Sequence, residues 1–511
     1  VDQGGEDVRV NGEAKLPFGF RGVADIEYLS SFVFRLAFAD TFSLAVNSEV
    51  RSNAFASRSY NGYSFNVAAS RYQNFQSTTR GDVITIVHAP GLDLGSVERK
   101  LGKTPLYWSY DASAEGVSRR EPGFVTDAVV GRYDVHPIVA LPLHLDGWDF
   151  RPEIGMRNTY YSERTNGSVT GLGAVLEQSI NRRVLETGVE IRPPSLSRIF
   201  ERKIGGYTIK HSFEPRIRYR YVNGVENFPE IIRFDSTDIV SDTNEIEYGV
   251  TNRIFAKGSK FTECQNLLVP ENGTHKVKPK VPGMPGVEET AGEEQPCRPG
   301  PPQAREVFSW EIAQKYFFDP TFGSAVVAGR RNVFTSTDEF TGIAFLTEPR
   351  KFSPLISRMR LTSAANNDLS WAFDYDTVQG RINASTVLLD HRFGNYFVGG
   401  SHAFLHVPGE VFSTNQITAP AVFNQVRWLA GYGNPNKRGI NAAVNMGFDV
   451  HEGFLQYTAV QTSYNWDCCG ISVEYRRFAL GSVRNENQFR FALSLTNVGT
   501  FGTMRRQERL F

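Results

Sequence analysis

Large apolar residues alternate with small or polar ones along most of this chain. In the run 488–498, the apolar positions are Phe489, Phe491, Leu493 and Leu495. A repeat of two residues is the period of a β-strand that has one face in an apolar medium. Similar runs follow one another at short spacing, and no helical pattern of normal length separates them. The pattern predicts an all-β fold of roughly 18 to 24 strands, each of about ten residues.

The N-terminal part of the chain shows this alternation clearly. Apolar or small residues alternate with charged ones over 20–28, and the run 32–38 continues with Phe or Leu at every second position and Arg35 on the other face. We expect a strand in each run. Asn61-Gly62, placed between two alternating runs, is a hairpin-turn sequence and predicts an antiparallel connection.

One segment, 257–305, breaks the alternation. It is rich in Pro, Gly, Glu and Lys, a composition that cannot bury a core. We interpret residues 1–511 as one barrel from which 257–305 projects as a long external loop. Cys264 and Cys297 are then able to staple the base of this loop. A linker between two domains is the alternative, and the loop is favoured because strand patterns resume directly after it.

Alternation alone fits either a soluble β-sandwich or a membrane barrel. The composition of the two faces of each strand decides between these two folds. The apolar faces are rich in aromatic residues, with 38 Phe and 20 Tyr in the chain. The polar faces carry Arg, Asp, Asn and Gln rather than the Lys and Glu common on soluble surfaces. Outward aromatic bands and a polar lumen are typical of outer-membrane barrels. We therefore predict a large antiparallel transmembrane β-barrel, because closure satisfies the backbone of a sheet in lipid.

Charge and motifs argue against several other classes. Lys and Arg total 55, as do Asp and Glu, and zero net charge argues against a general nucleic-acid binder. No run of about 18 apolar residues predicts a transmembrane helix. The start of the chain lacks the pattern of a signal peptide, so we expect a mature or truncated product. Nucleophile, phosphate-binding and dinucleotide-binding motifs are also missing from the sequence, and we expect no catalytic residue and no cofactor.

Two adjacent cysteines, Cys468 and Cys469, lie in an Asp-Cys-Cys-Gly sequence between two alternating runs. This is the place of a tight hairpin turn, in which we expect Gly470 to adopt a positive φ. Neighbouring cysteines rarely bond to each other, because the peptide between them is strained. We therefore expect each to pair with a cysteine elsewhere. The four cysteines match no zinc spacing, so no metal is expected, and they fit an oxidising compartment.

Three arginines, Arg216, Arg218 and Arg220, alternate with apolar residues and therefore share one face of a predicted strand. If this face is luminal, they form a basic ladder suited to phosphate groups, which the guanidinium fork binds well. The alternative is that they pair with Asp and Glu of neighbouring strands. The residues alone leave both interpretations open.

Several stretches resemble the LptD (also called OstA) family of lipopolysaccharide-assembly proteins. The most specific is Asn-Trp-Asp-Cys-Cys-Gly at 465–470, followed by Glu-Tyr-Arg-Arg at 474–477. A single motif such as Phe-Asp-Ser at 234–236 is weak, but the combined order of the motifs spans most of the chain. The other stretches are 25–31, 71–75, 213–219 and 248–253.

The resemblance implies a location and a function. In this family the barrel receives lipopolysaccharide from a periplasmic bridge protein and releases it sideways into the outer leaflet, while the lipoprotein LptE plugs the lumen. It therefore implies the outer membrane of a Gram-negative-type bacterium. The implied partners are lipopolysaccharide, outer-membrane lipids, the bridge protein and an LptE-like lipoprotein. The final strand, with Phe489, Phe491, Leu493 and Leu495, is expected to form one side of the lateral gate.

The sequence departs from the family pattern at its N-terminal end. The family's jelly-roll domain has no counterpart before Val1, and the first barrel strands are expected to be missing too. In the family the adjacent cysteines bond to cysteines near the N-terminus, so Cys468 and Cys469 lack their expected partners in this chain.

Two other functions remain as alternatives. A porin-like diffusion channel shares the alternation and the unequal loops, but it has no need of paired cysteines in a turn. A surface receptor would use the loop 257–305 as its binding element.

The loop hypothesis makes a prediction about its two cysteines. We expect Cys264 and Cys297 to be bonded, because a disulfide at the base of a long loop lowers the entropy of its open states. Non-reducing peptide mapping should recover the two peptides as one linked species that separates on reduction. Recovery of both residues as free thiols would contradict this.

Overall fold

The computed structural model describes most of the chain. Cys264, Cys297 and almost all of the predicted loop 257–305 lie outside the described residues. The described residues are 4–39, 42–167, 173–258, 304–330, 332, 347–362, 367–407, 409–413, 416–418, 421–433, 438–466, 468–481, 483–495 and 499–503.

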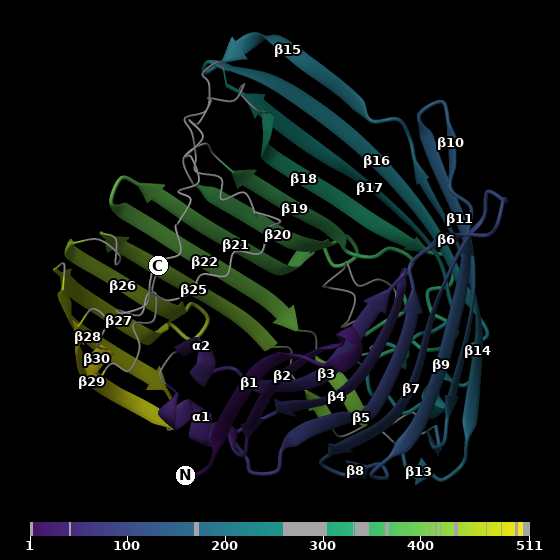
Figure 1. Ribbon diagram of the computed structural model, residues 1–511, viewed down its shortest axis with the longest axis horizontal. Helices are drawn as coiled ribbons and strands as arrows, with labels where there is room; N and C mark the ends of the chain where they lie inside the picture. The colour runs from purple at the N-terminus through teal and green to yellow at the C-terminus, as the bar shows by residue number, and fades with distance from the viewer. Residues whose placement is uncertain are drawn as a thin grey trace, which may run out of the picture.

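One large antiparallel sheet of 26 strands dominates the molecule and curls into the wall of a barrel (Figure 1). Within the described part, five of these strands (β6, β8, β10, β15 and β30) pair beside the ends of longer ones, which leaves 21 strands for the wall. The prediction of a large all-β antiparallel barrel is therefore confirmed. The strand number falls within the expected range.

The wall strands are β1 (Asp7–Lys15), β2 (Arg21–Leu29), β3 (Glu49–Tyr60), β4 (Tyr63–Phe75), β5 (Val83–Ser96), β7 (Tyr107–Glu121), β9 (Val130–Ala140), β11 (Trp148–Tyr161), β14 (Ile180–Arg192), β16 (Tyr207–Asn223), β17 (Thr243–Lys257), β18 (Ala304–Phe317), β19 (Leu355–Thr362), β20 (Asp368–Asp376), β21 (Arg381–Phe393), β22 (Tyr396–Val407), β25 (Ala421–Tyr432), β26 (Gly439–Asp449), β27 (Phe454–Asn465), β28 (Cys469–Leu480) and β29 (Arg484–Leu495). The shorter strands are β6 (Arg99–Lys100), β8 (Phe124–Val125), β10 (Leu143–Leu145), β12 (Arg164–Thr165), β13 (Val175–Leu176), β15 (Leu196–Ile204), β23 (Glu410–Ser413), β24 (Gln416–Thr418) and β30 (Gly499–Gly502). The helical elements are α1 (Phe32–Phe38), α2 (Phe42–Ala45), η1 (Pro17–Gly19) and η2 (Phe228–Glu230).

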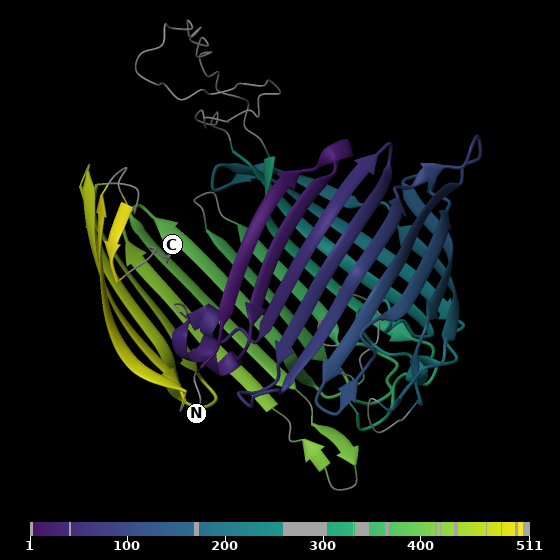
Figure 2. The same ribbon diagram turned by 60° about the horizontal axis from the view of Figure 1, so that its bottom comes forward.

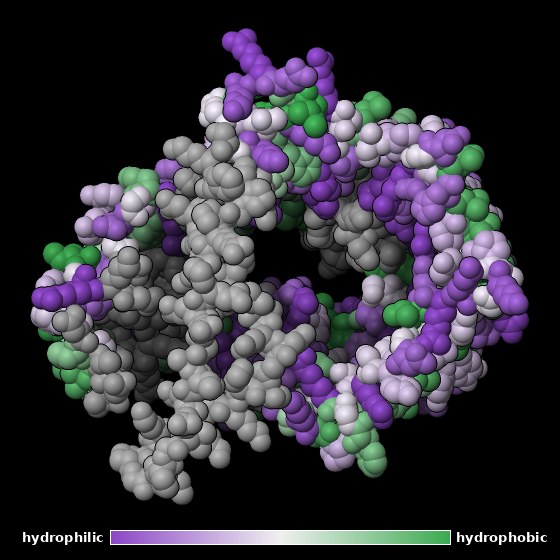
Figure 3. All heavy atoms as spheres, turned by 45° about the horizontal axis from the view of Figure 1, so that its top comes forward, coloured by the Kyte–Doolittle hydropathy of each residue, from purple (hydrophilic) through white to green (hydrophobic). Residues whose placement is uncertain are grey.

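Alternation sorts the side chains of each wall strand between the lipid and the lumen. On β9, Tyr133 and Val135 are exposed on the outer face, whereas Arg132 and Asp134 are buried on the inner face. An apolar outside and a polar inside are what a membrane barrel requires. The space-filling view looks into the hollow that these walls surround (Figure 3).

The hairpin predicted at Asn61-Gly62 joins β3 to β4, and both residues have a positive φ, of 48° and 77°. Two successive residues with positive φ form the type of turn whose twist matches that of the paired strands.

The sheet has two edges that do not pair with each other. Among the described residues, strand pairing runs from β1 to β29 and no pairing joins β1 to β29 or β30. β30 pairs only with the last part of β29, residues 492–495. The two edges stand apart in Figure 2. We call the break between β1 on one side and β29 with β30 on the other the seam.

The prediction of a strand over 32–38 is wrong, because this run forms the helix α1. Val33 and Leu36 are both buried, at the three-residue spacing of one helix face. Phe32 and Phe34 pack on Leu29 and its buried neighbours. A short run that is apolar at almost every position fits the period of a strand and that of a helix, so its alternation does not discriminate between the two. None of the described helices is both long and apolar enough to cross a membrane.

Two connections fill one end of the lumen and pack against strands from β5 to β19. The first is 224–242, between β16 and β17, which we call the inward segment. Its residues Val225 and Phe228 join Phe317, Phe322 and others in the largest buried apolar cluster of the described chain. Phe322 comes from the second connection, which follows β18. The apolar core of this barrel therefore lies inside its wall, at the end opposite the β15–β16 turn (Figure 1).

The entry to the inward segment depends on a glycine. Gly224 has φ of 115°, and a Cβ atom there would lie against the carbonyl oxygen of Arg183. The matched control is Gly206, which has φ of 85° but has open space around it.

We predict that Gly224→Ala lowers the free energy of unfolding by clearly more than Gly206→Ala. A left-handed backbone at a residue with a side chain costs about 1–3 kcal/mol at either position, and only Gly224→Ala adds a backbone clash. Denaturant titration of the refolded barrel measures both variants. Equal losses of unfolding free energy in the two variants would mean that the backbone at Gly224 can shift to make room for the added Cβ atom.

Candidate functional site

A buried ionic network anchors the inward segment to the inner face of the wall. Arg132 of β9 donates from Nη1 to both carboxylate oxygens of Asp238, each at 2.9 Å. Its Nη2 donates to Glu115 and to Asp235, each at 2.6 Å. Tyr161 of β11 donates to Asp238 at 2.7 Å. One arginine thus joins three carboxylates from the wall and the segment.

Further bonds fix the same segment to β14. Arg182 is buried, and its Nη2 donates to the carbonyl oxygen of Thr237 at 2.8 Å and to Thr159 at 3.0 Å. Asp238 also accepts from the backbone N–H groups of Phe234 and Asp235, at 2.8 and 3.0 Å. The segment is therefore held by its own turn as well as by the wall.

The two aspartates of the segment respond differently to this environment. Burial raises the pKa of the Asp238 carboxyl above its ordinary value, although Arg132 favours the charged form. At Asp235, burial acts in the same direction, but the hydrogen bond and the charge of Arg132 outweigh it and hold the pKa below its ordinary value. A lowered pKa means that Asp235 contributes stability at neutral pH, which is lost as the pH falls through its folded-state value.

His88, Glu115 and Asp235 lie close enough to one another to be considered as metal ligands. The carboxylate oxygens that face His88 already accept from Arg132. A cation at this position would sit beside a guanidinium that neutralises the same oxygens. We interpret this cluster as part of the ionic anchor.

The arginine ladder predicted on β16 lies on the luminal face. Arg216 contacts Glu247 at 2.8 Å, and Arg220 lies 3.8 Å from Glu186 of β14. Arg218, between them, is exposed. Two of the three arginines are therefore paired with acidic residues of neighbouring strands, which was the alternative interpretation of the sequence.

A cavity of about 530 Å³ lies along the inner face from β16 to β21. Its charged lining includes Arg216, Arg253 and Arg360. Arg253 has Glu306 at 3.3 Å, and Arg360 has Asp368 at 2.9 Å. An anionic ligand in this cavity would compete with carboxylates that already neutralise the arginines.

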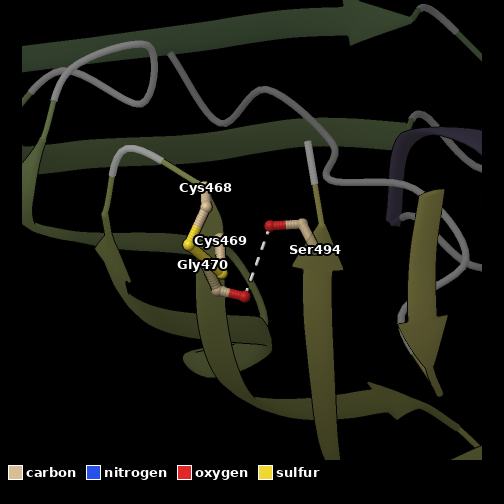
Figure 4. Close-up of a disulfide and its surroundings, with 4 residues drawn as sticks. All are labelled: Cys468, Cys469, Gly470 and Ser494. Atoms are coloured by element: carbon tan, nitrogen blue, oxygen red, sulfur yellow. Dashed lines mark hydrogen bonds between the residues drawn. A yellow bond between two sulfur atoms is a disulfide. The ribbon is translucent and has the colours of Figure 1, made fainter. Parts of the chain in front are cut away.

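The hairpin that carries the cysteines is formed as predicted, with β27 and β28 on either side. Cys468 and Cys469 are bonded to each other, whereas the sequence had led us to expect a partner elsewhere for each (Figure 4). The pairing that the family resemblance implied needs cysteines that this sequence does not contain, and it stays a prediction.

Gly470 also differs from expectation, since it lies in β28 and is not among the residues of positive φ. The reason for a glycine here is space. A Cβ atom would lie 2.6 Å from Oδ1 of Asn465 and 2.7 Å from Oγ of Ser494. The Ser494 hydroxyl donates to the Gly470 carbonyl at 3.3 Å (Figure 4).

The residues expected at the gate lie on the outer face of β29, beside the seam. Phe489, Phe491 and Leu493 are 77%, 60% and 40% exposed. Leu495 follows on the same face near the pairing with β30. These side chains would contact lipid at the last long strand of the wall.

Residues 8–404 match the family model of LptD, described as LPS transport system D. The chain belongs to the LptD family. As a member, it is a β-barrel of the outer membrane.

Individual relatives of this LptD-family chain are distant. The LPS-assembly protein LptD of Methylococcus capsulatus is 23% identical over 251 residues, which cover 45% of this chain and 23% of that protein. The match thus spans less than a quarter of the relative's length.

Among solved structures, the copper transporter OprC aligns with a TM-score of 0.26 and 8% identity, over 88% of this chain and 71% of its own. The FrpB iron transporter from Neisseria meningitidis (F5-1 variant) aligns with a TM-score of 0.29 and 10% identity, over 87% and 72%. At these scores we take nothing about function from either protein.

We predict that Arg132→Met strongly destabilises the LptD-family barrel and releases the inward segment. Removing one partner of a buried ion pair costs about 3–5 kcal/mol, because the other charges stay buried. Arg202→Met, at an exposed position on β15, should cost no more than about 0.5 kcal/mol. Denaturant titration measures the stability, and limited proteolysis within 224–242 reports the segment. Equal behaviour of the two variants would refute the anchor.

Proposed function

We propose that this chain is the barrel of a lipopolysaccharide translocon, which inserts lipopolysaccharide into the outer leaflet of the outer membrane. The observation that carries the proposal is the LptD family match over 8–404, joined to a barrel wall with an apolar outer face and a polar lumen. A lipid can leave a barrel sideways only where the wall can part. We place one side of that opening at the final strand of the described sheet, β29.

The polar part of the lipid would move along the lumen, past the ladder on β16. Arg218 is the member of the ladder that is exposed, and a guanidinium suits phosphate groups or acidic sugars. Arg216 and Arg220, with acidic partners, would shape the path rather than bind directly. In this proposal the charged wall guides the headgroup, and no covalent bond is made.

The acyl chains would leave past β29. Phe489, Phe491, Leu493 and Leu495 present an apolar surface on the outer side of this strand. This surface would contact the acyl chains as they pass from the opening into the leaflet.

We further propose two protein partners for this chain: a periplasmic bridge protein that delivers the lipid, and an LptE-like lipoprotein in the lumen. The inward segment packs at one end of the lumen, beside β14 to β19 and, through Ile232 and Phe234, against β5, β7 and β9. Cys468 and Cys469 would exchange their mutual disulfide with a disulfide between two N-terminal cysteines of a longer chain, so that two disulfides give the two that the family resemblance implies.

Photocrosslinking in cells tests the proposal. A photoreactive residue is placed at Arg218 or at Phe489 in the full-length gene, and at Val135 on the outer face of β9 as the control. We expect a lipopolysaccharide adduct at Arg218 that disappears when the cell's transport ATPase is depleted. Val135 faces the membrane, so any adduct there should be insensitive to short depletion.

Two outcomes would contradict the translocon. The absence of an adduct at Arg218 and Phe489, together with steady ion conductance of the purified barrel, would favour a porin-like channel. The same absence without conductance would favour a surface receptor.

A further inference from the structure

Three arginines meet at one end of the lumen, each from a different element. Arg119 belongs to β7, Arg233 to the inward segment and Arg330 to the second connection. The Nη1 atom of Arg119 donates to the backbone carbonyl oxygen of Arg233 at 2.5 Å. Burial lowers the pKa of Arg233 below its ordinary value, and the positive charges of Arg119 and Arg330 lower it further. The fold therefore gathers three like charges from distant parts of the chain.

Packing on both sides holds Arg233 in this place. Its neighbours Ile232 and Phe234 are buried in an apolar cluster with residues of β5, β7 and β9. Phe228, earlier in the inward segment, is buried in the cluster that includes Phe322 of the second connection. The Cζ atom of Arg233 lies over the Phe228 ring, 4.8 Å from the ring centre. Stacking holds the guanidinium by its face and leaves the N–H groups at its edge for an acceptor.

The described part of the chain compensates only one of these three charges. Arg119 is paired with Glu121, whose carboxylate accepts from its Nη2 atom at 3.1 Å. Within the same part of the chain, no carboxylate forms an ion pair with Arg233 or Arg330. The Nε atom of Arg119 is also buried there without an acceptor. Because an unpaired cation that is partly removed from water is costly, an anion that reaches these donors gains binding free energy.

We propose that Arg119, Arg233 and Arg330 form a binding site for a phosphate dianion between the inward segment and the second connection. The two uncompensated charges equal the charge of such a dianion. A phosphate offers oxygen acceptors in a tetrahedral arrangement, so donors from three elements can reach it together, whereas a carboxylate has two oxygens in one plane. Arg233 and Arg330 are both partly exposed, which gives a small anion access to their N–H groups. The bound phosphate replaces the repulsion among the arginines with a shared attraction and joins the two connections.

Denaturant titration separates a ligand site from a merely structural cluster. The full-length protein, purified in phosphate-free buffer as the complex that cells assemble, is unfolded with and without inorganic phosphate, and with chloride at equal ionic strength. Without phosphate, Arg233→Met should be at least as stable as the unaltered chain, because methionine removes an unpaired charge and keeps an apolar contact with Phe228. Phosphate should shift the midpoint of the unaltered chain upward and leave that of Arg233→Met in place. A loss of stability in Arg233→Met that is equal with and without phosphate would overturn the site.

Calorimetric titration of the same complex with inorganic phosphate measures the affinity directly. Arg233→Met and Arg330→Met should each weaken binding by about tenfold or more, since each removes a hydrogen bond between charged groups. Arg233→Lys keeps the charge without the guanidinium fork and should fall between Arg233→Met and the unaltered chain. Arg202→Met, at an exposed position on β15, should bind phosphate as the unaltered chain does. Equal affinities of Arg233→Met, Arg330→Met and Arg202→Met would place the phosphate elsewhere and overturn the site.

Two sources supply this chemistry: free inorganic phosphate and the headgroup of a phosphorylated lipid. A second titration therefore uses a phosphorylated glycolipid in detergent micelles, with its dephosphorylated form as the control. Binding of inorganic phosphate that is weakened in Arg233→Met supports the site with the free ion as ligand. Binding of the phosphorylated lipid alone, weakened in the same variant, supports it with a headgroup as ligand. Binding of neither probe, or equal stabilisation of the unaltered chain by chloride, would refute the site.

The phosphate site stands on its three arginines and does not require that lipid pass through the lumen. The photocrosslink at Arg218 in the unaltered chain reports lipid passage independently. Phosphate binding without any adduct would keep the site and reject the translocon, and an adduct without phosphate binding would do the reverse. All variants must keep the heat-modifiable mobility of a folded barrel on a gel, and Arg330→Met tests the site even if Arg233→Met fails to fold.

Discussion

A strand in lipid must have hydrogen-bond partners for its backbone, and this requirement shapes the whole molecule. Twenty-one wall strands of the described chain satisfy one another in turn, up to the outer edges of β1 and β29. The chain treats the two edges differently. β30 folds back along part of β29, while α1 stands beside the first edge, and Ala39, which follows it, accepts a hydrogen bond from Arg484 of β29.

In the described part of the chain, charged side chains inside the barrel are almost always paired with opposite charges. Arg132 meets three carboxylates, Arg216 meets Glu247, and buried Lys315 binds Glu245. An unmatched charge would be costly in such a setting, which explains a luminal face that is polar yet locally neutral.

The fold was predictable from the sequence, since strand period and aromatic content follow from local residue choice. The errors have physical causes. Residues 32–38 are apolar at nearly every position, so the period did not separate helix from strand, and burial of Arg35 against distant backbone decided the outcome. Gly470 is needed for close packing with Asn465 and Ser494 rather than for a turn.

The ionic anchor was missed for a different reason. Its partners, Arg132 and Asp238, are 106 residues apart, and the sequence around neither residue indicates that it pairs with the other. The only signal was Phe-Asp-Ser at 234–236, which was noticed as a weak family motif. Its aspartate, Asp235, turned out to bind Arg132. Which distant residues pair is set by the order of the strands in the sheet. The alternation of apolar and polar positions does not give that order.

The anchor also imposes an order on assembly. Asp238 can be satisfied only when β9, β11 and β14 already stand side by side, because its partners come from all three strands and lie 56 to 106 residues away in the chain. Contacts of high sequence separation form late and slowly in folding. The inward segment therefore becomes fixed only after this half of the wall is complete. In a growing barrel, its locking marks the moment at which the first strands can no longer exchange partners freely.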